Sequence, residues 1–233
     1  MNHFKLRNLE TKKLHYGKFL YKLAIHNPYA LYFRTEFQKG NLEYIKEKLK
    51  DDQINFDTGM PIYRTIYRSE VAVSDQDFLD AKTIYTHLKS GIDFKVRVER
   101  YNGLCLYSND KGFLLDLSDK IPNSAKEFWK PNKSNVSSLL SIKNIIIVDK
   151  EPDLKYKVTF NSKPINPSFG KWLSANTDKS RVGKYTLDNI CIGYANNSYI
   201  FIRDTKVLTM IELIVGHNIR KVEELIYKPN IDK

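Results

Sequence analysis

Hydrophobic and polar positions follow the same pattern in two stretches of the chain, offset by 94 residues. The first stretch runs from Asn102 to Lys120 and the second from Asn196 to Gly216. Each predicts an asparagine-containing turn, a short apolar strand, an aspartate at a helix start and an amphipathic helix. A pattern repeated at a fixed offset predicts a duplicated architecture.

The elements around the first stretch predict a module over residues 61–150. Ser74 followed by Asp77 is typical of a helix N-terminus, and Asn102-Gly103 is a strong hairpin signal. The polar stretch 122–142, which contains Phe128 and Trp129, predicts a long loop. The expected order is strand 63–73, helix 75–90, strands 94–98 and 104–107, helix 110–120 and strand 144–148.

The second stretch predicts a module over residues 151–233 with the same order. Its expected elements are strand 156–160, helix 169–177, strands 190–194 and 199–203, helix 205–215 and strand 222–227. This βαββαβ order is the ferredoxin-like arrangement. The expected fold class is therefore α+β, with two tandem ferredoxin-like modules, antiparallel sheets and a basic N-terminal extension over residues 1–60.

The charge favours a polyanionic partner. Lys and Arg number 38 against 27 Asp and Glu, which gives a net charge of +11. The basic excess concentrates in residues 1–60 and 120–186. A Lys-rich solvated surface is the alternative explanation, although it does not predict this segregation.

Cofactor and metal chemistry are not indicated. The five histidines and two cysteines form no cluster with metal-ligand spacing, so no cofactor and no metal are expected. Cys105 and Cys191 lie in apolar segments and are expected to be buried free thiols. The acids Asp149, Glu151 and Asp153 are expected to form a solvated linker.

Membrane insertion is not indicated either. No apolar run has the length of a membrane span, and the N-terminus lacks a signal-peptide core. The expected location is therefore intracellular, in the cytoplasm, with a virion as the alternative.

One face of the second predicted sheet is rich in aromatic residues. Pairing across Asn196-Asn197 would place Tyr194 opposite Tyr199, and the period of two adds Phe201 and Arg203 to that face. In topology and aromatic alternation this sheet resembles the RNA-recognition motif, whose helix-free face stacks bases on aromatic side chains. The basic-Gly opening of that motif is absent here. A face buried against the first module or residues 1–60 is the alternative.

Two further groups of basic residues are candidates for phosphate contact. Lys95 and Arg97 share a face of a predicted strand in the first module. Lys179, Arg181 and Lys184 lie in a polar segment, 176–184, that is expected to be a loop. Its single glycine does not match a phosphate-binding loop.

Three functional classes follow from these features. The first is a non-enzymatic nucleic-acid-binding protein, with single-stranded nucleic acid favoured and no catalytic residue. The second is a structural or assembly protein, possible in a virus or phage, that contacts a protein partner or itself. The third is a metal-independent endoribonuclease with His87 as general base, because CRISPR repeat-processing endoribonucleases also use two ferredoxin-like modules.

Overall fold

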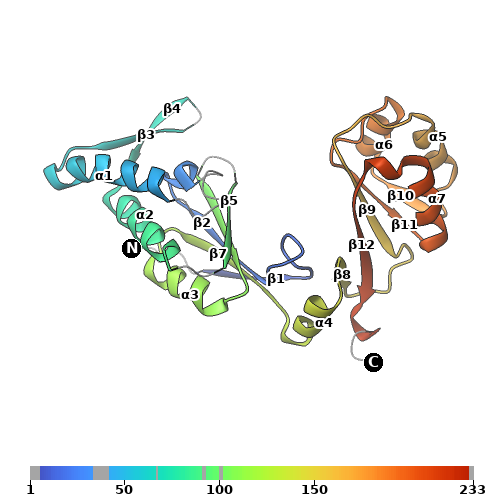
Figure 1. The fold of residues 1–233 in the computed structure, drawn as a ribbon, viewed down its shortest axis with the longest axis horizontal. Helices are drawn as coiled ribbons and strands as arrows, with labels where there is room; N and C mark the ends of the chain where they lie inside the picture. The colour runs from blue at the N-terminus through green and yellow to red at the C-terminus, as the bar shows by residue number, and fades with distance from the viewer. Residues whose placement is uncertain (1–5, 34–41, 67, 91–92, 100–101, 231–233) are drawn as a thin grey trace. The chain divides into compact units, whose positions relative to one another are not determined.

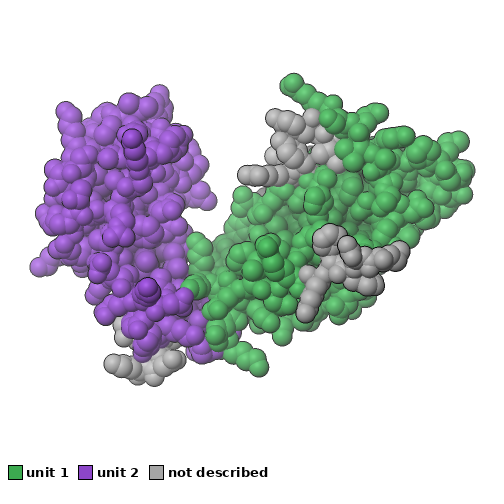
Figure 2. Space-filling view, turned by 180° about the vertical axis from the view of Figure 1, so that it is seen from behind, with its two compact units in different colours: residues 1–133 green, residues 134–233 purple. Residues whose placement is uncertain are grey.

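The computed structural model describes residues 6–33, 42–66, 68–90, 93–99 and 102–230 (Figure 1). Contacts divide the chain into two compact units, residues 1–133 and residues 134–233 (Figure 2). The predicted boundaries after residues 60 and 150 are therefore corrected to a single boundary after Lys133. Each unit has a hydrophobic core of its own.

Unit 1 is built on a five-stranded sheet in the order β1-β7-β2-β6-β5. Its strands are β1 (Arg7–Thr11), β7 (Ala125–Pro131), β2 (Tyr21–His26), β6 (Gly103–Ser108) and β5 (Phe94–Glu99). The β1–β7 pair is parallel and the other pairs are antiparallel. Gly103 is needed in the β5–β6 hairpin, because a Cβ there would overlap the Glu99 carbonyl oxygen.

The helices of unit 1 pack on one face of this sheet. They are α1 (Glu43–Thr58), α2 (Asp75–Leu88) and α3 (Lys111–Lys120), with a 3₁₀ turn η1 (Ala30–Phe33). Leu23 of β2 and Leu106 of β6 join Phe78, Ile84 and Leu114 in the core. The predicted starts of α2 and α3 are confirmed, because the side chains of Ser74 and Asp110 accept the expected capping hydrogen bonds.

The predicted long strand 63–73 is instead a two-stranded ribbon, β3 (Ile62–Ile66) and β4 (Ser69–Val73), separate from the main sheet. Arg68 has a φ of 71°, which turns the chain between the strands. A buried polar cluster anchors the ribbon: Arg64 forms an ion pair with Asp52 of α1, and the Tyr29 hydroxyl donates to Asp52 over 2.7 Å. The long insertion between β2 and α2 thus holds α1 and the ribbon.

The predicted loop 122–142 is also ordered as elements. It contains β7, a 3₁₀ turn η3 (Lys133–Asn135) and helix α4 (Val136–Ser141). Phe128 of β7 is buried in the core of unit 1. An Asn-, Ser- and Lys-rich composition hid the strand, and its buried residues, Ala125, Phe128 and Pro131, do not follow the two-residue period that marks a strand in a sequence.

Unit 2 contains a second five-stranded sheet, in the order β10-β11-β9-β12-β8. Its strands are β8 (Ile145–Val148), β9 (Tyr156–Phe160), β10 (Ser180–Val182), β11 (Tyr199–Ile202) and β12 (Ile219–Tyr227). The β8–β12 pair is parallel and the other pairs are antiparallel. Strand 144–148, assigned above to the first module, therefore belongs to the second sheet.

Three α-helices contribute to the core of unit 2: α5 (Ser168–Ala175), α6 (Lys184–Cys191) and α7 (Thr205–Val215). The 3₁₀ turns η4 (Gly216–Asn218) and η5 (Lys228–Asn230) flank β12. The prediction of a strand over 190–194 is wrong, because α6 occupies residues 184–191. Its Leu187 and Ile190 have the spacing of one helix face and pack against the core.

Read from the β8 edge, the second sheet has the order β8-β12-β9-β11-β10, which matches β1-β7-β2-β6-β5 position for position. In both units the first strand lies at one edge, parallel to the last strand of that unit. Residues 1–60 are therefore no extension, because β2 is the central strand of unit 1. The molecule is a mixed α+β protein with two five-stranded sheets.

Across the described part of the chain, no helix combines the length and apolar character needed to cross a membrane.

Candidate nucleic-acid interface

The two faces of the unit 2 sheet differ in what covers them. On β11, Ile200 and Ile202 are buried in the core with α5, α6 and α7. Tyr199 and Phe201 alternate with them and therefore point to the opposite face. Tyr199 is 48% exposed and Phe201 is half-buried. The predicted aromatic residues of β11 thus lie on the helix-free face of unit 2.

A row of three side chains crosses this face. Arg181 of the edge strand β10 pairs with Phe201 of β11, and Phe201 pairs with Lys157 of β9. Directly paired residues on antiparallel strands project to the same side of the sheet. The row therefore presents a cation, an aromatic ring and a second cation in sequence, and it continues from Lys157 to the buried Glu223 of β12.

Tyr199 extends this arrangement along β11. Its ring meets the ring of Phe201 edge to face, with centroids 5.5 Å apart. The Lys157 ammonium lies 4.0 Å from the Tyr199 ring centroid, which is within cation–π range. Aromatic rings beside cations can bind a base by stacking and its phosphate by charge.

A small pocket borders the row at Arg181 and Phe201. It has a volume of about 290 Å³, and its other lining residues are Val148 of β8, Leu225 of β12 and residues 150–154 of the β8–β9 connection. Lys150 of that connection adds a cation to the pocket wall, while Glu151 and Asp153 add carboxylates. The three acids that were expected to form a linker thus lie within unit 2, and two of them, Glu151 and Asp153, line this pocket.

Two residues predicted for this face are placed differently. Tyr194 follows α6, forms a bridge with Pro164 and is not paired with Tyr199. The prediction that Tyr194 faces Tyr199 is therefore wrong. Arg203 follows β11 and is exposed, and its guanidinium donates to the carbonyl oxygen of Asp178. The Asp178 carboxylate lies 3.6 Å from the same group.

The predicted basic loop 176–184 is mostly regular structure. Arg181 lies in β10, and Lys184 is the first residue of α6. Lys179 precedes β10, and its ammonium donates to the side-chain oxygen of Asn176 over 3.0 Å. Of the three, only Arg181 has a register that places it beside Phe201.

The helix-free face of unit 1 carries an equivalent row. Lys95 of β5 pairs with Tyr107 of β6, and Tyr107 pairs with Lys22 of β2. These strands hold the same sheet positions as β10, β11 and β9 of unit 2. Arg97 also lies on this face, as predicted from its alternation with Val96 and Val98, which pack against the core.

Unlike Phe201, Tyr107 is covered. It is 3% exposed and packs with Cys105 and Phe19. Phe19 belongs to the β1–β2 connection, residues 12–20. Burial raises the pKa of Cys105 to about 11 and lifts the pKa of Tyr107 well above its usual value.

Sequence reasoning missed Tyr107, Lys22 and Lys157. The offset of 94 residues relates Tyr107 to Phe201, so the repeat itself could have identified Tyr107. The two lysines lie on the strands that precede each repeated stretch, where no local pattern links them to it. Only the strand order places them next to the aromatic ring.

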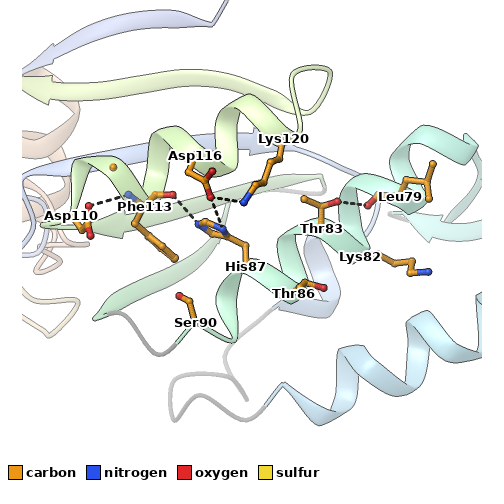
Figure 3. A pocket seen from close by; sticks show the side chains of 11 residues that line it. Leu79, Lys82, Thr83, Thr86, His87, Ser90, Asp110, Phe113, Asp116 and Lys120 are labelled. Atoms are coloured by element: carbon orange, nitrogen blue, oxygen red, sulfur yellow. Dashed lines mark hydrogen bonds and ion pairs between the residues drawn. The ribbon is translucent and has the colours of Figure 1, made fainter.

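A separate pocket of about 840 Å³ lies between α2 and α3 of unit 1 (Figure 3). Its inner wall includes His87, whose ring stacks on Phe113 with centroids 4.2 Å apart. The Nε2–H of His87 donates to the Phe113 carbonyl oxygen over 2.8 Å, and Nδ1 lies 3.5 Å from the Asp116 carboxylate. Burial lowers the pKa of His87. Both nitrogens therefore contact groups of α3, a geometry that joins the two helices.

Within the described ranges, no group of three or more His, Cys, Asp or Glu side chains could hold a metal ion. Both cysteines are free thiols. Cys105 is buried, as predicted, whereas Cys191 is exposed at the end of α6 because that segment is helical.

The chain was compared with protein-family models, curated proteins and solved structures, and none of them matches it.

Proposed function

We propose that this chain is a non-enzymatic nucleic-acid-binding protein that holds single-stranded nucleic acid on the helix-free face of unit 2. The observation that carries the proposal is the row Arg181–Phe201–Lys157, with Tyr199 beside it, on a sheet face opposite to the helices. Residues Lys95 and Arg97 of unit 1 and the basic residues Lys179, Lys184 and Arg203 of unit 2 remain candidates for backbone contact.

The chemistry favours a single strand. Stacking on a protein aromatic ring requires a base whose face is free, and bases in a duplex are already stacked on each other. Stacking supplies ~1–3 kcal/mol per base and tolerates every base, and the flanking cations add a salt-dependent attraction to phosphates. DNA and RNA both meet this description, so both belong in the test.

We further propose that the two units are tandem ferredoxin-like modules related by duplication. Four strands of each sheet have the ferredoxin-like order, in which the last strand borders the first and the third separates the first from the second. In unit 1 these are β7-β2-β6-β5, and in unit 2 they are β12-β9-β11-β10. The extra first strand and the aspartate caps at Asp110 and Asp204 recur in both units, which favours a common origin.

Assembly is a second candidate function, favoured by exposed apolar side chains on the helices of unit 2. Leu213 of α7 is 84% exposed and Tyr185 of α6 is 77% exposed. Large exposed apolar side chains are typical of protein contact sites when they form a patch. Sedimentation of the wild type and of Leu213→Ser over a range of concentrations tests it: concentration-dependent association that Leu213→Ser abolishes supports assembly.

Binding measured by fluorescence anisotropy with labelled single-stranded DNA and RNA oligonucleotides tests the main proposal. Tyr199→Ala and Phe201→Ala should each weaken binding about 5-fold to 100-fold, which corresponds to one lost stack. Tyr185→Ala is the matched control, because Tyr185 is an exposed aromatic residue of the helix layer.

Thermal unfolding of the same variants separates binding from folding. Tyr199→Ala should leave the melting temperature nearly unchanged, because its side chain is half exposed. The proposal fails if the two β11 variants bind as tightly as the Tyr185→Ala control, or if the wild type binds neither oligonucleotide.

A further inference from the structure

We propose that the helix-free face of unit 1 is a second site for single-stranded nucleic acid, and that Tyr16 occupies it in the free protein. This inference rests on the function proposed for unit 2. The row Lys95–Tyr107–Lys22 has the strand positions and the cation–aromatic–cation order of Arg181–Phe201–Lys157. The two rows differ in one respect: in unit 1 the ring of Tyr16 lies against the central aromatic residue, Tyr107.

Tyr16 contacts the same three side chains that a nucleotide on this face would contact, namely Tyr107, Lys95 and Arg97. Its ring lies edge to face on Tyr107, with centroids 5.0 Å apart. The Lys95 ammonium lies 4.4 Å from the Tyr16 ring centroid, and Arg97 donates to the Tyr16 hydroxyl over 3.2 Å. A nucleotide would likewise offer Lys95 the face of its base and Arg97 an oxygen of its backbone.

The backbone at Tyr16 is unusual for its residue type. Tyr16 and Gly17 have φ values of 55° and 68°, and they form the centre of a tight turn closed by hydrogen bonds between His15 and Phe19. Such turns favour Asn-Gly, because a bulky residue is strained at positive φ. The needs of the turn therefore do not explain why residue 16 is a tyrosine. Backbone strain of this kind is typical of functional positions.

The turn can leave the face without unfolding unit 1. Tyr16 is 48% exposed, and its neighbour Lys18 is held by an exposed ion pair to Asp93. Phe19, by contrast, is buried against Tyr107 and anchors the end of the loop. Movement of the turn at residues 15–18 would uncover the part of the Tyr107 ring that His15 and Tyr16 contact, while Phe19 stays in place.

The direct test is Tyr16→Asn in the full-length chain. This change removes the ring and creates the Asn-Gly pair that the turn prefers, so the melting temperature should stay the same or rise. A short single-stranded oligonucleotide that covers one face should then bind at one additional site per chain, measured by titration at stoichiometric concentrations. In a Phe201→Ala background, Tyr16→Asn should tighten binding about fivefold, because it removes one competing aromatic contact.

Two matched variants complete the design. Tyr63→Asn removes an exposed aromatic residue of unit 1 on the ribbon strand β3 and should change neither stoichiometry nor affinity. Tyr16→Phe keeps the ring and removes the hydroxyl that Arg97 binds, so its effect should be smaller than that of Tyr16→Asn.

The outcomes distinguish this inference from the proposed function. If Phe201→Ala weakens binding but a folded Tyr16→Asn protein gains neither a site nor affinity, the unit 1 site is refuted and the unit 2 site stands. Weaker binding by Tyr16→Asn also refutes the unit 1 proposal, because Tyr16 would then contact the nucleic acid instead of blocking its site. A gain on Tyr16→Asn with no effect of Phe201→Ala supports the unit 1 site alone. Absence of binding by every variant refutes both.

Discussion

Phe201 and Tyr107 occupy the same position in two sheets of the same strand order, each between two cations. One ring is half exposed and the other is buried under a loop of its own unit. At the scale of single residues, two properties can be tested by substitution: the charge of Arg181 beside Phe201, and the protonation of His15 in the connection that covers Tyr107.

Arg181 should contribute to the salt dependence of binding. Each phosphate neutralised on a single strand contributes ~0.7 to the slope of log affinity against log salt concentration. Arg181→Gln should reduce that slope by about this amount, whereas Lys171→Gln removes an equal charge from α5 in the helix layer and should leave the slope unchanged. Equal slopes for wild type and Arg181→Gln would show that Arg181 contacts no phosphate.

His15 should make unit 1 sensitive to acid. Burial, and then the charges of Lys22 and Lys13, lower the pKa of His15 to about 4, while Glu99 acts in the opposite direction. The unfolded chain, with a His pKa of about 6.5, therefore binds more protons than the folded chain between these values, and stability falls as pH falls through this window.

His15→Gln removes this titration. The melting temperature of the wild type should therefore drop more than that of His15→Gln between neutral pH and about pH 4.5. His87 has the same sign and remains in both proteins, so it does not alter the comparison. Parallel pH profiles would contradict the buried, neutral state of His15.

At the scale of elements, a buried ion pair joins the β3–β4 ribbon to α1. Asp52→Ala would leave Arg64 nearly buried without its carboxylate partner, next to Tyr29. Loss of one member of a buried pair costs about 3–5 kcal/mol. Asp51→Ala is the control, because its carboxylate is exposed and forms an ion pair across one turn of the same helix with Lys48. Chemical denaturation of both variants checks the difference, and equal stabilities would refute the anchoring role.

Elements with strong local signals could be predicted from the sequence. The caps at Ser74, Asp110 and Asp204 indicated the starts of α2, α3 and α7, and strict alternation of apolar and polar residues identified β5. The segment 184–194 could not be assigned in this way. Its apolar residues at 190, 192 and 194 fit a strand, while Leu187 and Ile190 fit a helix, and packing against the core decides for the helix.

At the scale of the whole molecule, strand pairing could not be predicted. The central strand of the unit 1 sheet, β2, is separated from α2 by a long insertion. The β3–β4 ribbon inside that insertion has a strand-like sequence pattern, so it was predicted to be the sheet strand that precedes α2. The aromatic residues of β11, Tyr199 and Phe201, were identified because a spacing of two residues within one strand places them on the same face. Lys22 and Lys157 were missed because they reach the site only through sheet order.

The boundary between the two units, after Lys133, predicts which fragments of the chain fold by themselves. A fragment of residues 134–233 retains a complete five-stranded sheet and its core, so it should unfold cooperatively. A fragment of residues 61–150 lacks β2, the central strand of its sheet, and should not fold. Near-UV circular dichroism and thermal melts of the two fragments test this, and a cooperative melt of residues 61–150 would contradict the strand order.

The central claim is that the helix-free face of unit 2 binds single-stranded nucleic acid. Its most direct measurement is an NMR titration of the ¹⁵N-labelled protein with a single-stranded oligonucleotide. Amide shifts should concentrate on β9, β10 and β11, including Lys157, Arg181 and Phe201, and should be small on the exposed positions of α5 and α7. Shifts confined to the helices, or no shifts at saturating oligonucleotide, would contradict the claim.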